Sequence, residues 1–278
     1  MGGIDILLVT YNRPEYVRLS LPRLLDTATA DTRVWVWHNG TDAETLAAVQ
    51  AYRDRLHRFH HDPANPGLRE PTNWLWREAG GDYLSKVDDD CLEQPGWLET
   101  LRRAHEQVPQ FGVIGAWRFP EEDLDPELAA RKLADYPHGH RLLRNHWVQG
   151  SGYLLKRAVL EQVGPLRPEE SFTRWCLRTA RAGWINGWYH PFIREDHMDD
   201  PRSPNTIYHT DADLRARPPL SARAVGASTI ADWTEQMTHS ARIVQAASLD
   251  LDDYYGWKLR RYNLGRRLRR ALTGRAPW

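Results

Sequence analysis

Three consecutive aspartates, Asp88–Asp90, are the residues of this sequence best suited to binding a metal ion. The residues before them, 83–87, have the composition of a buried strand, and a Gly-Gly pair separates that strand from what precedes it. Adjacent carboxylates repel one another, and a divalent cation is the usual partner of such a cluster. On an extended chain Asp88 and Asp90 point to one side and Asp89 to the other, so Asp88 and Asp90 can share one ligand. A solvated acidic turn is the alternative interpretation.

Strand and helix patterns alternate around this triplet, which predicts an α/β fold with a mostly parallel sheet flanked by helices. In such a sheet the acidic strand ends at the carboxyl edge, where ligands bind. The 121–144 segment is polar and partly aperiodic, and we expect an excursion or lid over the edge of the sheet. Strand patterns occur at 4–10, 33–38, 58–60, 83–87, 112–117 and 184–189, and helical patterns at 14–25, 43–52, 73–79, 96–106, 157–163, 169–182 and beyond 212.

Composition narrows the class of protein. The 278 residues include 37 Lys and Arg against 37 Asp and Glu, so the chain lacks the net positive charge that would indicate a nucleic-acid partner. The two cysteines, Cys91 and Cys176, form neither a disulfide framework nor a zinc motif, which favours a reducing compartment. The first five residues lack the basic start of a signal peptide, and no apolar run reaches membrane-spanning length. We therefore expect a cytoplasmic protein.

Several short blocks appear in a fixed order between Ile4 and His197. Together they resemble the family-2 glycosyltransferases, which have the GT-A fold, a Rossmann-type sheet flanked by helices. The resemblance implies a catalytic domain over 1–211, with a nucleotide-sugar half (1–117) and an acceptor half (118–211), and a helical, basic C-terminal extension over 212–278. The blocks are Val9–Arg13, Asn39–Asp42, Asn65 with Gly67 and Asn73, Gly80–Asp90, Gly150–Arg157, and Arg178 with Gly183-Trp184.

The resemblance implies an inverting enzyme that moves a hexosyl or deoxyhexosyl group from a nucleoside-diphosphate sugar to an acceptor hydroxyl. Asp88–Asp90 is then the family's metal-binding Asp-x-Asp motif, with Asp88 mainly on the nucleotide and Asp90 on Mn²⁺ or Mg²⁺. Such a cation neutralises the negative charge of the leaving diphosphate. His197 is the second expected metal ligand, against the alternative of a surface histidine, with His190 and His209 as weaker candidates.

An inverting transferase also needs a general base for the acceptor hydroxyl. Relatives often carry an acidic pair at positions that are Ser171 and Phe172 here, which is a departure from the family pattern. Glu170, or Glu169 beside it, is the nearest candidate, and both are alternatively ordinary acids at the start of a helix. A base on the 121–144 segment, or a contribution from Asp89, remains open.

The expected nucleotide-sugar contacts lie mostly in loops after the first strands. His38 stands where relatives commonly have an acid that contacts uracil, so we expect UDP to be less favoured and leave GDP and dTDP sugars open. A strand-end histidine facing solvent is the alternative. The full set is Thr10, Tyr11, Arg13, His38, Asn39, Arg69, Asn73, Asp88 and Asp89.

The C-terminal stretch 257–272 is basic and amphipathic, with Leu264, Leu268 and Leu272 on one helical face. Such a segment can lie on an anionic membrane surface, which would suit a lipid-linked acceptor and a location at the inner face of the membrane. A solvated helix that docks its leucines on the domain is the alternative. A glycan or a small molecule is equally open as the acceptor, and no nucleic-acid motif is present.

Two other classes of function are weighed against the transferase. A sugar-nucleotide nucleotidyltransferase should carry a Gly-rich loop with Arg or Lys after its first strand, and Thr10–Pro14 is not such a loop. A carbohydrate- or partner-binding protein that kept the fold but lost turnover is compatible with the missing acidic pair at Ser171-Phe172.

Overall fold

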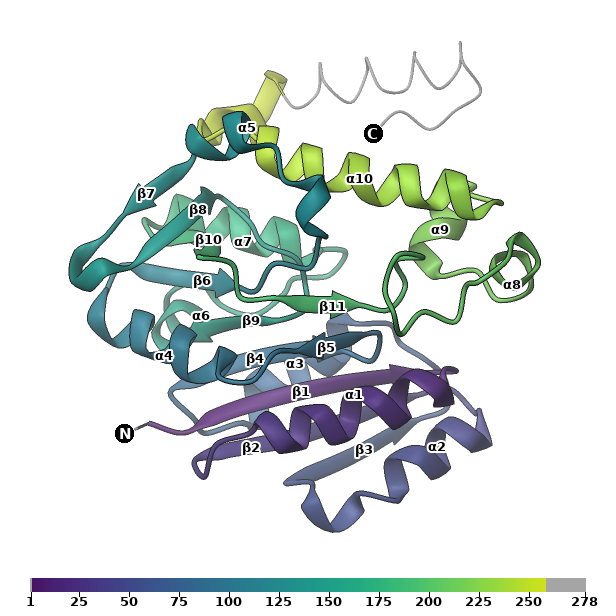
Figure 1. Cartoon of the computed structure of the whole chain (residues 1–278). Helices are drawn as coiled ribbons and strands as arrows, with labels where there is room; N and C mark the ends of the chain where they lie inside the picture. Colours follow the sequence, from purple (N-terminus) through teal and green to yellow (C-terminus); the bar gives the residue numbers. More distant parts are fainter. Residues whose placement is uncertain (1, 259–278) are drawn as a thin grey trace.

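The computed structural model describes residues 2–258, and in that range a nine-stranded sheet forms the centre of the molecule (Figure 1). The strand order is β3-β2-β1-β4-β9-β6-β10-β8-β7. Strands β1 to β4 run parallel, whereas β9 lies antiparallel between β4 and β6. The bounds are β1 (Ile4–Tyr11), β2 (Thr32–Asn39), β3 (Arg58–Asp62), β4 (Tyr83–Asp88), β6 (Phe111–Gly115), β7 (Leu133–Asp135), β8 (Arg141–Asn145), β9 (Tyr153–Lys156) and β10 (Ile185–His190).

Helices cover both faces of the sheet, and the alternating residues of β1 show why. Ile4, Ile6 and Leu8 belong to one apolar core, and Leu7 and Val9 belong to another. A strand with apolar residues on both faces requires a helical layer on each side. The first core packs against α1 (Pro14–Thr27), α2 (Ala43–Gln50) and α4 (Trp97–Gln107), and the second against α3 (Arg69–Glu78), α6 (Arg157–Val163) and α7 (Phe172–Arg181).

The starts of two helices bear on the site. Helix α2 begins after its cap Asp42, whose carboxylate accepts a hydrogen bond from Thr45 N at 2.7 Å. Helix α7 begins at Phe172 after the cap Ser171, so the predicted helix over 169–182 was too long at its start. Glu169 has φ +59°, in the left-handed region, and cannot continue a right-handed helix. Glu169 and Glu170 therefore lie in a loop and not in the first helical turn.

The expected lid over 121–144 is wrong. Most of this segment, through β7 and β8, extends the sheet at the far edge beyond β10, with the short helix α5 (Pro126–Ala130) before them. Beyond the predicted strand pattern at 184–189, the chain forms a further short strand, β11 (Glu195–His197), which pairs antiparallel with β5 (Cys91–Glu93). This two-stranded ladder places His197 directly opposite Cys91, next to the aspartate triplet.

The described part of the C-terminal region is helical, as predicted, and comprises α8 (Asp211–Ala216), α9 (Leu220–Val225) and α10 (Ile230–Ala246). These helices share a third apolar core with Trp233 and Met237, and α10 crosses one end of the molecule (Figure 1). None of the helices within residues 2–258 combines the length and apolar character needed to cross a bilayer. All but the first two residues of the basic stretch 257–272 lie outside the described residues.

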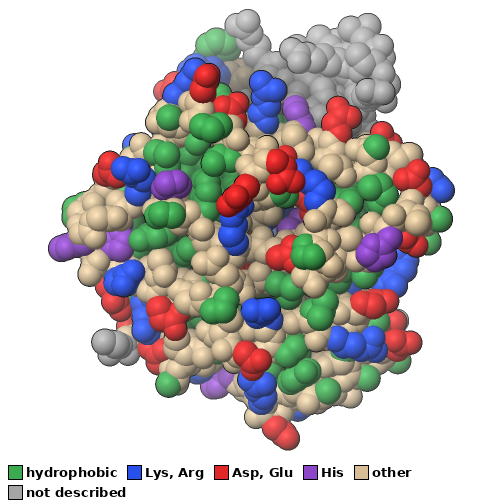
Figure 2. All heavy atoms as spheres, in the orientation of Figure 1, with side chains coloured by type: hydrophobic (Ala, Val, Ile, Leu, Met, Phe, Trp, Pro, Cys, Tyr) green, Lys and Arg blue, Asp and Glu red, His purple; other side chains and the backbone are tan. Residues whose placement is uncertain are grey.

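Charged side chains of both signs are interspersed over the face of the molecule shown in Figure 2. Lys and Arg alternate with Asp and Glu over the described part of that face, which agrees with the equal numbers of basic and acidic residues in the chain. The distribution of charge over this face therefore does not point to a binding surface of one sign.

Candidate functional site

A cavity of about 750 Å³ opens where β1, β2 and β4 end at the carboxyl edge of the sheet. Its volume lies in the range of small-molecule sites. One end is formed by residues that directly follow these strands, and the other by the β11 loop and helices α8 to α10. The predicted site residues that line it are Tyr11, Arg13, Asn39, Asp88, Asp89, Asp90 and His197.

Each aspartate of the triplet has different partners. Asp88 pairs with Lys86, two residues earlier on β4. Asp89 accepts a hydrogen bond from Tyr11 N at 2.8 Å, which ties the end of β4 to the end of β1. Asp90 lies 3.3 Å from Arg13 Nη1 and faces the β5–β11 ladder. The strand end therefore sends its three carboxylates to three separate contacts.

The carboxylates in the cavity outnumber their positive partners. Arg13 donates to both oxygens of Asp199 at 2.8 Å as well as to Asp90, and one guanidinium cannot neutralise two buried carboxylates. Burial raises the pKa of Asp199 well above its usual value, and the charge of Asp90 adds to that effect. Burial likewise raises the pKa of Asp88, and that of Asp89 to about 7. A cation bound here would relieve this repulsion.

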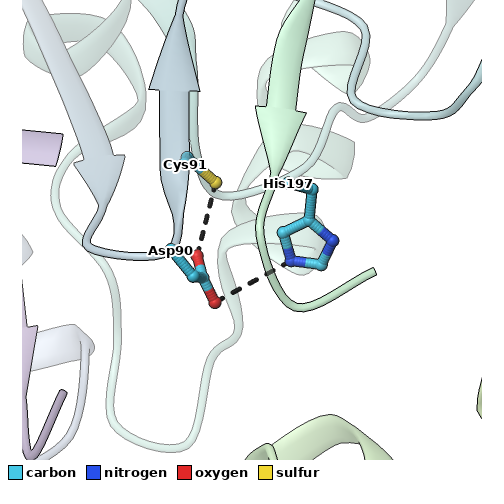
Figure 3. A group of neighbouring side chains, drawn as sticks. All are labelled: Asp90, Cys91 and His197. Atoms are coloured by element: carbon cyan, nitrogen blue, oxygen red, sulfur yellow. Dashed lines mark hydrogen bonds and ion pairs between the residues drawn. The ribbon is translucent and has the colours of Figure 1, made fainter. Parts of the chain in front are cut away.

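Asp90, Cys91 and His197 form the group best placed to hold a metal ion (Figure 3). One Asp90 oxygen accepts from the Cys91 thiol at 3.3 Å, and the other lies 3.8 Å from His197 Nε2. Burial lowers the pKa of His197 to about 4, so its imidazole is neutral at neutral pH and has a lone pair for a metal. Burial raises the pKa of Cys91 well above normal, so its sulfur stays a thiol and is a poor ligand.

The donor set fits a hard or borderline divalent cation. Burial opposes ionisation of Asp90, yet positive charge nearby lowers its pKa. His197 and Arg13 both contribute to that lowering, and at neutral pH, where the His197 imidazole is neutral, Arg13 is the one of the two that still carries positive charge. An ionised carboxylate and a neutral imidazole suit Mn²⁺ or Mg²⁺, whose remaining ligands come from phosphate oxygens and water.

Thr10 and His38, both predicted to touch the nucleotide, lie beneath the cavity surface. Both side chains are 0% exposed, and Thr10 Oγ1 is 2.9 Å from His38 Nδ1. The His38 ring packs beside His61, with 5.0 Å between ring centroids. Neither residue is among those that line the cavity within the described chain, and the alternative of a solvent-facing His38 is wrong.

The remaining predicted residues also lie away from the cavity lining of the described chain. Asn73 binds the backbone of Leu166 through both ends of its amide, at 2.9 and 3.0 Å, and so joins α3 to the loop before α7. Arg69 is partly exposed at the start of α3. Glu170 makes a two-point ion pair with Arg178, with N–O distances of 2.7 and 2.8 Å, and Glu169 is exposed.

Several lining residues were not assigned from the sequence. Asn65 and Gly67 line the end of the cavity that lies at the strand ends, which we call the near end, and only the family resemblance indicated their loop. Asp199 lies two residues after His197, and that acidic run was the one signal that could have suggested it. Arg118 follows β6, and no motif or spacing distinguishes it from the other arginines.

A buried pair of glutamates lies beside the candidate metal ligands. Glu93 and Glu195 face each other across the β5–β11 ladder, and each is 2% exposed. Burial raises the pKa of Glu93 well above normal, and the neighbouring Glu195 carboxyl group adds to this effect. Burial also raises the pKa of Glu195. A methyl group at Gly152 would overlap Glu195 Oε2 and lie 2.7 Å from Glu93 Oε1. Glycine at this position of the chain therefore leaves room for the pair.

Comparison with known proteins agrees with this architecture. The mannosyltransferase PcManGT from Pyrobaculum calidifontis, in complex with GDP-Man and Mn²⁺, superposes with a TM-score of 0.58 at 16% identity, over 96% of this chain and 80% of that one. Residues 1–349 of TarS from S. aureus, in complex with UDP-GlcNAc, give a TM-score of 0.56 at 14% identity, over 95% and 92%. At these identities the likeness establishes the GT-A type of fold. The sequence model described as glycosyl transferase family 2 matches residues 5–163, more than half of the chain, and the chain therefore belongs to that family of glycosyltransferases.

Proposed function

We propose that this glycosyltransferase takes its sugar from a nucleoside-diphosphate sugar, with inversion and with the help of a divalent cation. The observation that carries the proposal is the gathering of Asp90, His197 and Arg13 at the carboxyl edge of the sheet, in a cavity large enough for a sugar nucleotide. PcManGT and TarS, which share the fold, bind GDP-Man and UDP-GlcNAc, respectively.

The nucleotide is assigned to the near end of the cavity. Tyr11 and Asn39 end adjacent parallel strands, and Asn65 and Gly67 complete the wall beside them. Asn39 is held in place, because its Oδ1 accepts from Trp37 Nε1 at 2.9 Å and its Nδ2 donates to Gly67 O at 3.2 Å. These are neutral groups that can bind a base and a ribose, whereas the charged residues lie farther along the cavity toward the β11 loop.

Asp90 and His197 would hold Mn²⁺ or Mg²⁺, with Asp88 directed toward the nucleotide and its sugar. When bound, the cation neutralises charge on the leaving diphosphate as a Lewis acid. Arg13 keeps Asp90 ionised and fixes its orientation through the shared contact with Asp199. Burial keeps His197 neutral and therefore able to bind metal at neutral pH.

Thermal stability in the presence of UDP, GDP, dTDP or CMP, each with and without Mn²⁺, tests the donor site and names the nucleotide. A ligand at about a hundred times its Kd stabilises the folded state by about 2.7 kcal/mol, which raises Tm by roughly 5 °C or more for a chain of this size. We expect a Mn²⁺-dependent shift with one diphosphate, lost in Asp90→Asn. Asp82→Asn, an exposed acid just before the start of the same strand, should behave like the wild type.

Turnover separates an enzyme from a binding protein on the same fold. Donor consumption should fall at least about a hundredfold in Asp90→Asn, since one group that stabilises developing charge is removed. A wild-type protein that binds a sugar nucleotide but neither transfers nor hydrolyses it would support the binding protein. No shift with any nucleotide would overturn the proposed donor site.

The general base is a separate part of the proposal, on Glu170 with Glu169 as the alternative. Burial raises the pKa of Glu170, but the ion pair with Arg178 lowers it, and the net effect is a lowered pKa. Glu170 must therefore leave Arg178 before it can accept a proton well. If Glu170 is the base, Glu170→Gln should lower kcat by about 10²–10⁴. An unchanged kcat with a lower Tm would show that Glu170 only anchors its loop, and Glu169→Gln is the matched comparison.

A further inference from the structure

Two residues, Arg118 and His197, line both the main cavity and a second one beside it. The second cavity, which we call the annex, has a volume of about 460 Å³ and lies between the segment after β6 and the loop around β11. Arg118 and His197 therefore form the boundary between the expected metal site and the annex. A group bound on either side of this boundary can be reached by the Arg118 guanidinium.

Arg118 forms no ion pair with a carboxylate of the described chain, although its charge lowers the pKa of the nearby Asp88 and Glu195 against the effect of burial. The Nε of Arg118 is buried without a hydrogen-bond acceptor among residues 2–258. The guanidinium lies over the Phe119 ring, with 5.4 Å from its carbon to the ring centroid. A buried guanidinium nitrogen without an acceptor is energetically unfavourable, and its planar set of donors matches phosphate oxygens.

The other two arginines of the annex are already neutralised, which distinguishes Arg118 from them. Arg194 contacts Glu121 at 2.6 Å and donates to Phe119 O at 2.7 Å. Arg202 binds Asp200 and Asp123, both at 2.7 Å. Arg13, at the other side of the metal candidates, is likewise held by Asp199. Of these four arginines in the described chain, Arg118 alone is left to bind an anion from outside.

We propose that Arg118 binds a phosphate oxygen at the boundary of the two cavities, a subsite that rests on the proposed sugar-nucleotide reaction and extends it. The phosphate has two chemical sources. It is either the diphosphate of the donor, beside Asp90 and His197, or a phosphate carried by the acceptor and bound in the annex. In the first case Arg118 stabilises the leaving group, and in the second it positions the acceptor next to the sugar.

Titration calorimetry on four proteins tests the subsite: the wild type, Arg118→Met, Arg118→Lys and Arg103→Met. Arg103 is an exposed arginine on α4 outside both cavities and serves as the matched control. The probes are UDP, GDP, dTDP and inorganic pyrophosphate with Mn²⁺, and then inorganic phosphate added to protein saturated with the preferred nucleotide and Mn²⁺. Because Arg118 makes no hydrogen bond within the described chain, we expect all four proteins to keep a similar Tm.

A hydrogen-bonded charge pair contributes enough to change Kd by roughly ten- to a hundredfold. A loss of that size in Arg118→Met for the diphosphates, partly restored in Arg118→Lys, assigns the subsite to the donor. Unchanged diphosphate binding with loss of the added phosphate assigns it to the acceptor. Values within twofold of the wild type for every probe overturn the proposal.

The same titrations separate this inference from the proposed function. If the wild type binds pyrophosphate through Arg118 but no nucleotide, the subsite stands and the sugar-nucleotide reaction fails. If all four proteins bind one nucleotide equally and none binds added phosphate, the reaction stands and the subsite fails. Failure of the wild type to bind any probe overturns both.

Discussion

The near and far ends of the main cavity are built from different kinds of structure. At the near end Tyr11, Asn39 and Asp88 stand at the ends of adjacent strands, so the hydrogen bonds of the sheet fix their backbone positions. The far end consists of the β11 loop and helices α8 to α10, and side chains from the first half of the chain hold the loop in place. The near end is thus positioned by regular secondary structure, and the far end depends on a few specific tertiary contacts.

Three of these contacts converge on two consecutive residues of the far end. Arg13 donates to the Asp199 carboxylate, the Tyr16 hydroxyl donates to Met198 O at 2.7 Å, and Trp233 Nε1 donates to Asp199 O at 2.6 Å. His197, the expected metal ligand, immediately precedes this pair. We infer that the proposed metal site is complete only when the far end is docked, which would give the contacts a role in function as well as in stability.

Breaking the Arg13–Asp199 contact should have the largest effect on stability. Arg13→Met removes the guanidinium that Asp199 and Asp90 share, and removal of one partner of a buried pair typically costs about 3–5 kcal/mol. Denaturant unfolding at neutral pH measures this change. Arg18→Met, which breaks an exposed pair with Glu44, should cost less than about 1 kcal/mol.

A double variant decides whether the uncompensated charge is the cause. Arg13→Met combined with Asp199→Asn should recover part of the lost stability, because the carboxylate left unpaired is then neutral. Added Mn²⁺ should also stabilise Arg13→Met if Asp90 binds the ion. A double variant no more stable than Arg13→Met would show that Arg13 acts by packing and not by charge.

The next effect concerns the ladder that carries His197. Gly152→Ala should cost about 2–4 kcal/mol, because alanine is strained at φ +61° and its methyl group would overlap the Glu195 carboxyl group. Gly226→Ala is the matched control, since Gly226 has φ +76° but no atom within 4 Å of the added methyl group. It should cost about 1 kcal/mol. Equal losses in the two variants would remove the argument for a crowded glutamate pair.

The residues of the near end could largely be predicted from the sequence, and those of the far end could not. Asp88–Asp90, Tyr11 and Asn39 follow apolar stretches long enough to be recognised as strands, and neighbouring parallel strands end at one edge. Strand β11 has three residues, too few for any periodicity, so the ladder beside Cys91 was missed. The partners of Arg13, and the absence of an acceptor for Arg118 Nε among residues 2–258, depend on how distant segments pack together, which no local pattern encodes.

Two sequence-based interpretations show the same limit at single residues. His38 was placed on the nucleotide because relatives commonly have a uracil-contacting acid at that position. Alternation along β2 turns His38 and Asn39 to opposite faces, and His38 is buried against Thr10. Glu170 was chosen as the acid nearest to the missing pair, and its ion pair with Arg178 became visible only in the folded chain.

The pH dependence of stability tests the burial of His38. Burial lowers the pKa of His38 to about 4 from an unfolded value near 6.5, so the unfolded chain takes up a proton between pH 6.5 and 4 that the folded chain does not. This difference in protonation has no effect on the free energy of unfolding above pH 6.5, and it destabilises the fold by about 2 kcal/mol at pH 5. His38→Asn should therefore lose about 2 kcal/mol less than the wild type between pH 8 and pH 5. Parallel curves for the two proteins would contradict the assignment.

Removing one hydroxyl group between the two ends should give the smallest effect. Tyr16 is 0% exposed, and its hydroxyl donates to Met198 O and accepts from Ile207 N at 3.3 Å. Tyr16→Phe should cost about 1–2 kcal/mol, because both backbone groups lose their partner while the ring still packs. Tyr52→Phe, in a partly exposed residue on the outer side of the first core, should change stability by less than about 0.5 kcal/mol.

Hydrogen exchange should show which part of the molecule loses stability in Tyr16→Phe. If the far end depends on such contacts, amides of residues 198–208 should exchange faster in Tyr16→Phe while those of β4 keep their protection; equal acceleration in both segments would show that the two ends unfold as one unit.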